Sequence, residues 1–437
     1  MTAEIAILNR NAVAMAADSA VTLQLPGGQK IYNTVNKLFA LSKYRPLGVM
    51  VYGSADFMRI PWETIIKIYR ADLYDKGYPH LEEYASDFID FFHRETTLFP
   101  PELQSASASE YLRIGLSRLR EKIDGEVQRT IKEMGSIDEE QIKVLIRNKV
   151  AAFVEDLDKC EDLPGFGRED IENCATERKN EIQAALQAVF EKLPIAEVSE
   201  QLLHAGSLVL CKKFARKNYS GIVIAGYGEK DLFPSLVAYE CECVIGNRLR
   251  YVEANHSKIG IAGQESVASV NPFAQREMVN RFMEGVDPRY LYVVESYVSE
   301  LLMKGYPAKI AQALAGKVTD ELQETVRKEL VKLGEKLAED FKAELNEYRR
   351  HQFVEPVIDS VASMPKDELA AMAESLVNLT AFKRRMTSVE TDTVALPIDV
   401  AVISKGDGFV WIKRKHYFEP ELNHQFFSNY YRKDGAR

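Results

Sequence analysis

The first residues of the chain could form a nucleophile that uses its own main-chain amine as a base. Removal of Met1 would make Thr2 the first residue, with a free α-amine beside its hydroxyl. An α-amine has a pKa of about 7.7–8, which suits a general base near neutral pH. It could take the hydroxyl proton, through a water, while the oxygen attacks an amide carbonyl and forms an acyl-enzyme. Because a small second residue permits removal of the initiator methionine, the sequence allows this chemistry.

A carboxylate is expected beside this threonine because the chain folds back on itself. Ile5–Leu8 and Ala12–Ala17 are apolar runs separated by Asn-Arg-Asn, a pattern typical of two buried strands joined by a tight turn. In a hairpin centred on Arg10, opposed residues lie equally far from that centre. The pattern therefore predicts that Thr2 faces Asp18.

A neighbouring cation would lower the pKa of the amine and favour its neutral form, which is the one that acts as a base. Lys37 is the candidate, because the run at 38–41 after it has the composition of a strand, and Asp18 would hold its charge. Lys30 is a rival for this role, although it follows closely on a Pro-Gly-Gly loop. Taken singly, each group is better explained as a strand-end or solvent-facing residue. Together with Thr2 in one hairpin, the functional interpretation is preferred.

These segments resemble proteasome β-subunits and the bacterial proteasome-like peptidases, which are N-terminal nucleophile hydrolases of the terminal threonine type. The order of the similar segments along the chain also follows the family order. The segments are the run from Thr2 to Ile7, the run from Val13 to Ser19, the lysine-bearing strand at 36–41, the strand and glycine turn at 48–56, and weaker matches at 221–228, 260–263 and 398–404.

The resemblance implies an α+β fold class, namely a four-layer αββα sandwich with helical insertions. Since neither face of such a sheet meets water, its strands should be continuous apolar runs. Because the family fold needs a much shorter chain, insertions are required. The expected core comprises residues 1–78, 206–285 and 365–437, and the expected helical insertions are 79–205 and 286–364.

The resemblance also implies two further site residues. Gly53 matches a glycine whose backbone N–H stabilises the oxyanion, and glycine permits close approach of a substrate. Asp392 matches an aspartate that supports the terminal amine. The chain departs from the family at Gln264 and Ala395, which stand where serines that support the amine are expected. The surroundings of the amine are therefore altered, which leaves a non-catalytic role open.

Apolar periodicity predicts the remaining elements. Four strands are expected within residues 3–53, followed by a helix with Pro61 near its start and Trp62, Ile65, Ile66 and Tyr69 on its buried face. The other predicted helices are at 81–95, 107–135, 138–157, 168–203 and within 273–385, and the other predicted strands are at 207–211, 221–227, 236–244, 248–253, 394–404 and 409–413.

Composition excludes several classes of function. A net charge of −9 argues against nucleic acid as the main partner, because phosphate binding needs clustered positive charge. No apolar run is long enough for a membrane span, and no secretion signal is visible. The five cysteines and seven histidines lack metal-ligand spacing, so no metal or cofactor is expected. A cytoplasmic location is expected.

Three hypotheses follow for the function. The preferred one is a threonine-type hydrolase that cleaves amide bonds in a peptide or protein substrate, with Thr2 as nucleophile and base. The family resemblance implies a homo-oligomer and leaves a partner ATPase undefined. The second hypothesis is a catalytically inactive scaffold or ring subunit of the same fold, and the third is a small-molecule amidase.

Overall fold

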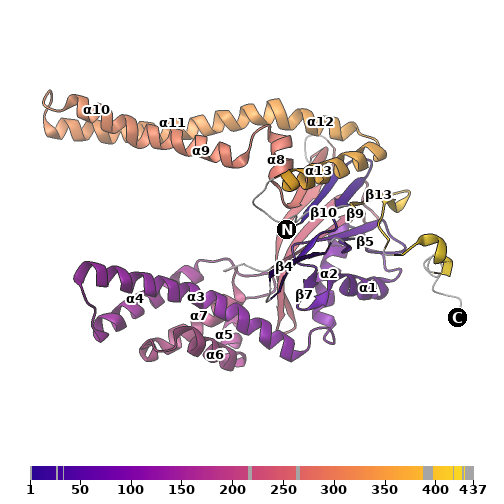
Figure 1. Ribbon diagram of the computed structural model, residues 1–437, viewed down its shortest axis with the longest axis horizontal. Coiled ribbons are helices and arrows are strands. Elements are labelled where there is room, and N and C mark those ends of the chain that lie inside the picture. The colour runs from indigo at the N-terminus through magenta and orange to yellow at the C-terminus, as the bar shows by residue number, and fades with distance from the viewer. Residues whose placement is uncertain are drawn as a thin grey trace. The chain divides into compact units, whose positions relative to one another are not determined.

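The structure is a computed structural model that describes residues 2–25, 28–32, 34–214, 219–261, 266–386, 397–416, 418–425 and 428, with only the backbone described over 21–25 and 28–31. The chain divides into two compact units (Figure 1). The first unit consists of Met1–Leu38 and Lys258–Arg437, and the second consists of Phe39–Ser257. Each unit contains a five-stranded sheet with helices packed against it, so each is described separately.

The sheet of the first unit is antiparallel and has the strand order β12-β1-β2-β13-β14. Every residue of β1, β2 and β13 is buried, which agrees with the continuous apolar runs that the sequence shows there. The strands are β1 (Ala3–Asn9), β2 (Val13–Ala17), β12 (Ala268–Ala274), β13 (Asp399–Ser404) and β14 (Gly408–Lys413). A separate two-stranded ribbon consists of β3 (Val21–Leu25) and β4 (Gly28–Tyr32).

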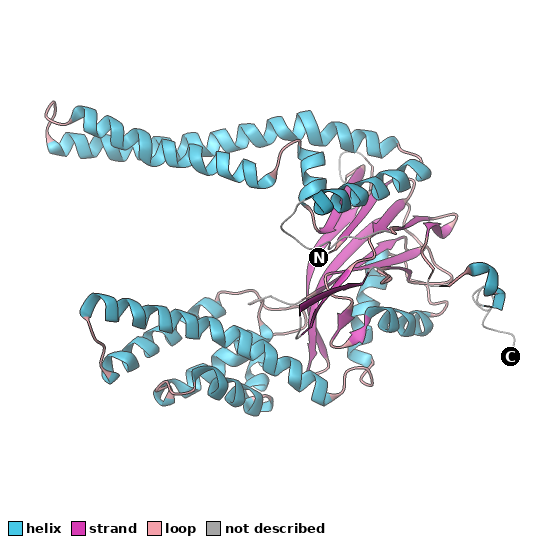
Figure 2. Ribbon diagram, in the orientation of Figure 1, coloured by secondary structure: helices cyan, strands magenta, loops and turns pink. Residues whose placement is uncertain are grey.

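Helix α13 (Lys366–Met386) lies along β1, β2 and β13 of this sheet (Figure 2). The alanines of β2 face a helix stripe that is itself rich in alanine, and these small side chains let the helix approach the sheet closely. The other helices of the unit are α8 (Glu277–Glu284), α9 (Pro288–Glu300), α10 (Tyr306–Leu314), α11 (Asp320–Arg349) and α12 (Glu355–Ser363). In Figure 1, α9, α10 and α11 form a long helical hairpin, in which α9 and α10 are joined by a π-helical turn at Leu301–Gly305.

The turn between β1 and β2 differs from the prediction by one residue. The N–H of Asn9 donates to the carbonyl of Ala12 at 3.1 Å, so the loop has two residues rather than three. The side-chain oxygen of Asn9 also accepts from the N–H groups of Asn11 and Ala12, which fixes this shorter turn. Glu4 consequently pairs with Ala17, and the pairing predicted between Thr2 and Asp18 is wrong. Because side chains alternate between faces, a slip of one residue changes which groups share a face.

The second unit contains a sheet with the order β11-β10-β9-β6-β5 and two hydrophobic cores. Aromatic side chains of α1 and α2 fill the first core against β6, β9 and β10, and α3 to α7 surround the second. The strands are β5 (Leu38–Ala40), β6 (Leu47–Tyr52), β7 (Asp56–Phe57), β8 (Ile60–Pro61), β9 (Ser220–Gly226), β10 (Ser235–Ile245) and β11 (Arg248–Lys258). The helices are α1 (Trp62–Leu73), α2 (Leu81–Arg94), α3 (Pro101–Met134), α4 (Glu139–Asp158), α5 (Arg168–Glu177), α6 (Lys179–Phe190) and α7 (Ser199–Cys211).

The structure confirms a mixed helical and antiparallel-sheet architecture and the helix that follows Pro61. Three predictions of local structure are wrong. Residues 207–211 end helix α7 instead of forming a strand, because an apolar run of five does not distinguish a buried strand from a buried helix. Phe273 lies in β12, and helices resume only at Glu277. Residues 3–53 contain six strands rather than four.

The start of the predicted strand at 394–404 lies outside the described residues, which resume at Pro397. The predicted αββα layering and the predicted domain boundaries stay predictions, since the two sheets lie in different units. Within the described parts of the chain, no helix is both long enough and apolar enough to span a bilayer.

Candidate functional site

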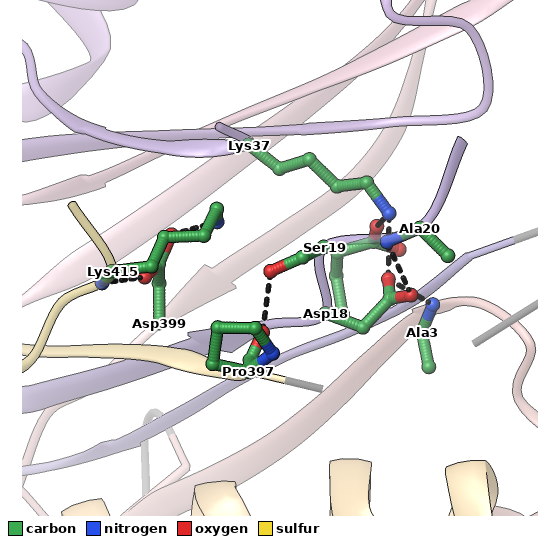
Figure 3. Close-up of polar contacts among 9 residues, drawn as sticks. Ala3, Asp18, Ser19, Ala20, Lys37, Pro397, Asp399 and Lys415 are labelled. Carbon is green, nitrogen blue, oxygen red and sulfur yellow. Dashed lines mark hydrogen bonds and ion pairs between the residues drawn. The ribbon is translucent and has the colours of Figure 1, made fainter. Parts of the chain in front are cut away.

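Lys37 and Asp18 form a buried ion pair in the first unit (Figure 3). The Lys37 Nζ lies 2.6 Å from Asp18 Oδ1, and both side chains are almost completely removed from solvent. Asp18 directly follows β2, and Lys37 lies near the end of the N-terminal segment of the same unit. A buried charge needs a partner of opposite sign, which each of these residues supplies to the other.

Backbone N–H groups fix the Asp18 carboxylate in place. Oδ1 also accepts from the N–H of Ala3 at 3.1 Å, and Oδ2 accepts from the N–H of Ala20 at 3.1 Å (Figure 3). The N–H of Asp18 in turn donates to the carbonyl of Ala3 at 3.2 Å. Asp18 therefore lies opposite Ala3 and holds the residue that follows Thr2, rather than facing Thr2 itself.

Thr2 directly precedes β1 and is 2% exposed. Its carbonyl accepts from the N–H of Gln275, which continues the pairing of β1 with β12 by one residue. Its hydroxyl oxygen is buried and makes no hydrogen bond of normal geometry with the described residues. Strand pairing thus fixes the backbone of Thr2, while its hydroxyl lies beside the carboxyl group of Glu4.

Glu4 is a second carboxyl group at this site, and the sequence analysis did not identify it. Its Oε1 lies 3.3 Å from Lys37 Nζ, so Lys37 stands between two buried carboxyl groups. Burial raises the pKa of Glu4 to about 8; the Asp18 charge also raises it, while the Lys37 charge and the nearby Thr2 hydroxyl lower it. At neutral pH, Glu4 is therefore mostly protonated.

A second buried ion pair lies close to this cluster. Asp399 at the start of β13 pairs with Lys415, whose ammonium and backbone N–H both donate to the carboxylate (Figure 3). Burial lowers the pKa of Lys415, and the charge of Lys37 lowers it further, whereas Asp399 and Asp18 oppose this effect. The two lysines therefore influence each other electrostatically. The hydroxyl of Ser19 donates to the carbonyl of Pro397, which ties the end of β2 to the approach to β13.

The predicted site residues have different outcomes. Asp18 and Lys37 are brought together. Thr2 lies near them, because its hydroxyl is beside Glu4 and Glu4 in turn lies 3.3 Å from Lys37. Gly53 follows β6 with a positive φ of 85°, but it belongs to the second unit, so its oxyanion role stays a prediction. Asp392 lies outside the described residues, as do Gln264 and Ala395. The side chain of the rival Lys30 is also outside the described part of the structure.

The sequence carried a signal for Glu4. Every other residue of the run at 3–8 is apolar, and a charged side chain in a fully buried strand needs a buried partner. Glu4 also lies two positions after Thr2, and residues two apart in a strand point to the same face. This pattern could have placed Glu4 beside the candidate nucleophile.

The arrangement supports general-base and electrostatic chemistry at the start of β1. A positive charge at Lys37 would favour the neutral form of an amine and would stabilise negative charge on an attacking oxygen. Among the described residues, no group of three or more His, Cys, Asp or Glu side chains could hold a metal ion.

Comparisons with known proteins find distant similarity among solved structures. No protein-family model matches the chain. No curated protein matches it either. Among solved structures, it matches Anbu (ancestral beta-subunit) from Yersinia bercovieri over 100% of this chain and 99% of that chain, with 9% sequence identity and a TM-score of 0.26. A TM-score this low indicates only a distant likeness.

Proposed function

We propose that the chain, after removal of Met1, is an N-terminal threonine hydrolase that cleaves amide bonds through an acyl-enzyme. Thr2 supplies the nucleophilic hydroxyl, and its α-amine is the general base. Lys37 supplies positive charge, and Asp18 holds that charge in position. Peptides are the expected substrates, and a homo-oligomer is the expected assembly.

The observation that carries this proposal is the buried contact of 2.6 Å between Lys37 and Asp18 next to the first strand. A surface ion pair would have no such significance, because exposed pairs are common and contribute little to stability. A buried pair is costly to form, and this one is joined to Ala3, the residue after the candidate nucleophile. The neighbouring Glu4 has a pKa that burial raises to about 8, and carboxyl groups with such shifted pKa values are enriched at functional sites.

A second candidate function is a non-catalytic scaffold. The observation that favours it is the burial of Thr2, whose side chain has almost no surface accessible to a substrate. In that case Met1 would be retained, the amine would be blocked, and the charge cluster would serve only stability.

Intact mass separates the two candidates. The purified chain is weighed before and after treatment with a β-lactone or epoxyketone probe, which reacts covalently with a terminal threonine nucleophile. A hydrolase loses Met1 and gains one probe mass at Thr2, whereas Thr2→Ala gains none. Retention of Met1 together with no adduct would favour the scaffold.

Substrate class needs a separate measurement. Turnover of a panel of short peptides is compared with turnover of simple amides of matched leaving group. Faster peptide turnover agrees with the proposed peptidase, and the reverse result would assign the chain to the small-molecule amidases.

A further inference from the structure

Among the described residues, three carboxyl groups and two lysines make up this cluster. Asp18 forms an ion pair with Lys37, and Asp399 forms one with Lys415. Of these two lysines, Glu4 contacts only Lys37, which is already paired with Asp18. Both carboxyl oxygens of Glu4 are buried and lack a hydrogen-bond partner of normal geometry in this part of the chain. The nearest donors to this carboxyl group are the Lys37 ammonium and the Thr2 hydroxyl, and two carboxyl oxygens can accept more hydrogen bonds than these supply.

The Thr2 hydroxyl lies beside this carboxyl group, which bears on the position of the Thr2 α-nitrogen. Thr2 and Glu4 are two residues apart along one extended segment, so their side chains point to the same face. The Thr2 hydroxyl is near enough to lower the pKa of Glu4. The α-nitrogen is three covalent bonds from that hydroxyl oxygen, so it lies in the same small space. Removal of Met1 would convert this nitrogen from an amide into an amine that can carry positive charge.

We propose that Glu4 is the partner of the Thr2 α-amino group in the mature chain and that it orients the amine toward the Thr2 hydroxyl. This inference rests on the function proposed above and deepens it, because it adds a third member to the nucleophile and its base. Active nucleophiles commonly have this form, in which a base is itself oriented by another group. Glu4 acts through the amine and is therefore a positioning residue.

The attack on the substrate carbonyl conserves atoms and charge. The Thr2 oxygen forms a bond to the substrate carbonyl carbon, its proton moves to the α-nitrogen, and the carbonyl π electrons move to the carbonyl oxygen. The amine becomes an ammonium beside the Glu4 carboxyl group. When Glu4 is ionised, it stabilises this new positive charge, as a buried carboxylate stabilises a charged base in a catalytic triad.

The titration of the two groups is expected to be coupled. Glu4 has a pKa of about 8 before the amine is present, and an α-amine has a pKa of about 7.7–8. Two such groups in contact share one proton over the neutral range, and the measured pKa values belong to the pair. The other charged groups that act on Glu4 are Lys37, which favours its ionised form, and Asp18, which opposes it. The more distant charge of Lys415 is balanced by that of its own ion-pair partner, Asp399.

The alternative is that Glu4 serves only as a second partner for Lys37. A structural role of this kind would change stability in a Glu4 variant but would leave the titration of the Thr2 amine unchanged. The amine titration is therefore the decisive observable.

The test uses the full chain released from a fusion so that Thr2 is its first residue, with threonine labelled by ¹⁵N. The titration of the α-amine is followed by NMR in the wild type, in Glu4→Gln and in Glu374→Gln, which removes a carboxylate from a surface ion pair of the same unit. We expect the amine to titrate at a pH about one unit lower in Glu4→Gln than in the wild type, because an adjacent carboxylate favours the ammonium form. Glu374→Gln should match the wild type. Identical titrations in all three chains would overturn the proposal.

Glu4→Gln is expected to fold, because Glu4 is mostly neutral at pH 7 and glutamine has the same shape. Glu4→Asp provides a second variant that keeps the carboxylate but shortens its reach, and its amine should titrate between the other two. If the amine of Glu4→Asp instead titrates at the same pH as that of Glu4→Gln, the contact needs the full length of the glutamate side chain. An amine in Glu4→Asp that titrates at a lower pH than in Glu4→Gln would contradict the proposal.

Activity gives an independent readout. If the chain hydrolyses peptides, Glu4→Gln should lower kcat about tenfold or more, shift the acid limb of kcat/KM to lower pH and change KM little. If the wild type does not react with the probe, the proposed function fails, but the amine titration still decides whether Glu4 is the partner of the amine. An unchanged amine titration in an active enzyme would instead reject Glu4 and retain the hydrolase.

Discussion

Replacement of Lys37 by methionine tests whether the buried ion pair is formed as described. Methionine fills much of the volume of the lysine stem but leaves Asp18 without its cation. Removal of one partner of a buried pair costs about 3–5 kcal/mol. Asp18 retains the N–H groups of Ala3 and Ala20, so we expect a loss near the lower end, about 3 kcal/mol. Glu4 adds little, because its raised pKa keeps it mostly neutral at pH 7.

The assay is urea unfolding at pH 7, supported by thermal melts. For a unit of this size, a loss of about 3 kcal/mol lowers Tm by about 6–12 °C. The matched control is Lys413→Met, which removes an exposed ion pair with Glu374 and should cost less than about 1 kcal/mol. The double variant Asp18→Asn with Lys37→Met should be less destabilised than the sum of its parts, since each single change leaves the other partner unpaired.

The reasoning is refuted if Lys37→Met is as stable as Lys413→Met. It is also refuted if the costs of Asp18→Asn and Lys37→Met simply add, because additivity would mean that the two side chains do not interact.

Three further predictions concern Glu4, Gly53 and Asn9. Burial raises the pKa of Glu4 from 4.5 to about 8, so the contribution of its protonated form to stability is complete below pH 4.5 and is lost as pH rises to about 8. The free energy of unfolding of the wild type should therefore fall relative to that of Glu4→Gln between these pH values. Parallel urea titrations of the two chains at several pH values check this. In urea unfolding, Gly53→Ala should cost about 1–3 kcal/mol, and more than Gly246→Ala. Both glycines have positive φ, but the carbon added at Gly53 would lie 2.9 Å from a backbone carbonyl oxygen, whereas Gly246 faces open space. Asn9→Ala should cost about 2 kcal/mol or more, because the buried side-chain amide of Asn9 donates to the carbonyls of Val361 and Met364 at the end of α12. The exposed Asn11→Ala should cost much less, and equal thermal melts of the two variants would contradict this difference.

The sequence predicted those parts of the fold in which local pattern and tertiary environment agree. The helix after Pro61 has a proline before its first turn and an apolar stripe that packs into the core, and both signals are local. Buried strands such as β1 and β2 were visible because both of their faces are covered and their sequences are continuously apolar.

The errors arose where tertiary structure decides between two local choices. The turn at Arg10 admits loops of two or three residues, and the side chain of Asn9 selects the shorter one by bonding to the backbone beyond it. The apolar end of α7 has the composition of a strand, but it continues a helix whose earlier residues already pack in the second core.

The site was predicted in part for the same reason. Asp18 and Lys37 could be proposed as a pair from residue type and order, and they form this pair although Asp18 lies opposite Ala3 rather than Thr2. Glu4 was not predicted because the hairpin pairing concerns residues on opposite strands, although its position two residues after Thr2 is a purely local signal.

The central claim is that Lys37 and Asp18 activate Thr2, and the most direct test is the rate at which a terminal-threonine probe labels chains that begin with this residue. Mass spectrometry follows adduct formation in the wild type, in Lys37→Met and in Lys30→Met, under conditions in which all three are folded. The account predicts one adduct at Thr2 in the wild type and in Lys30→Met, and labelling of Lys37→Met slower by about a hundredfold. Equal labelling of Lys37→Met and the wild type, or loss of labelling in Lys30→Met alone, would contradict it.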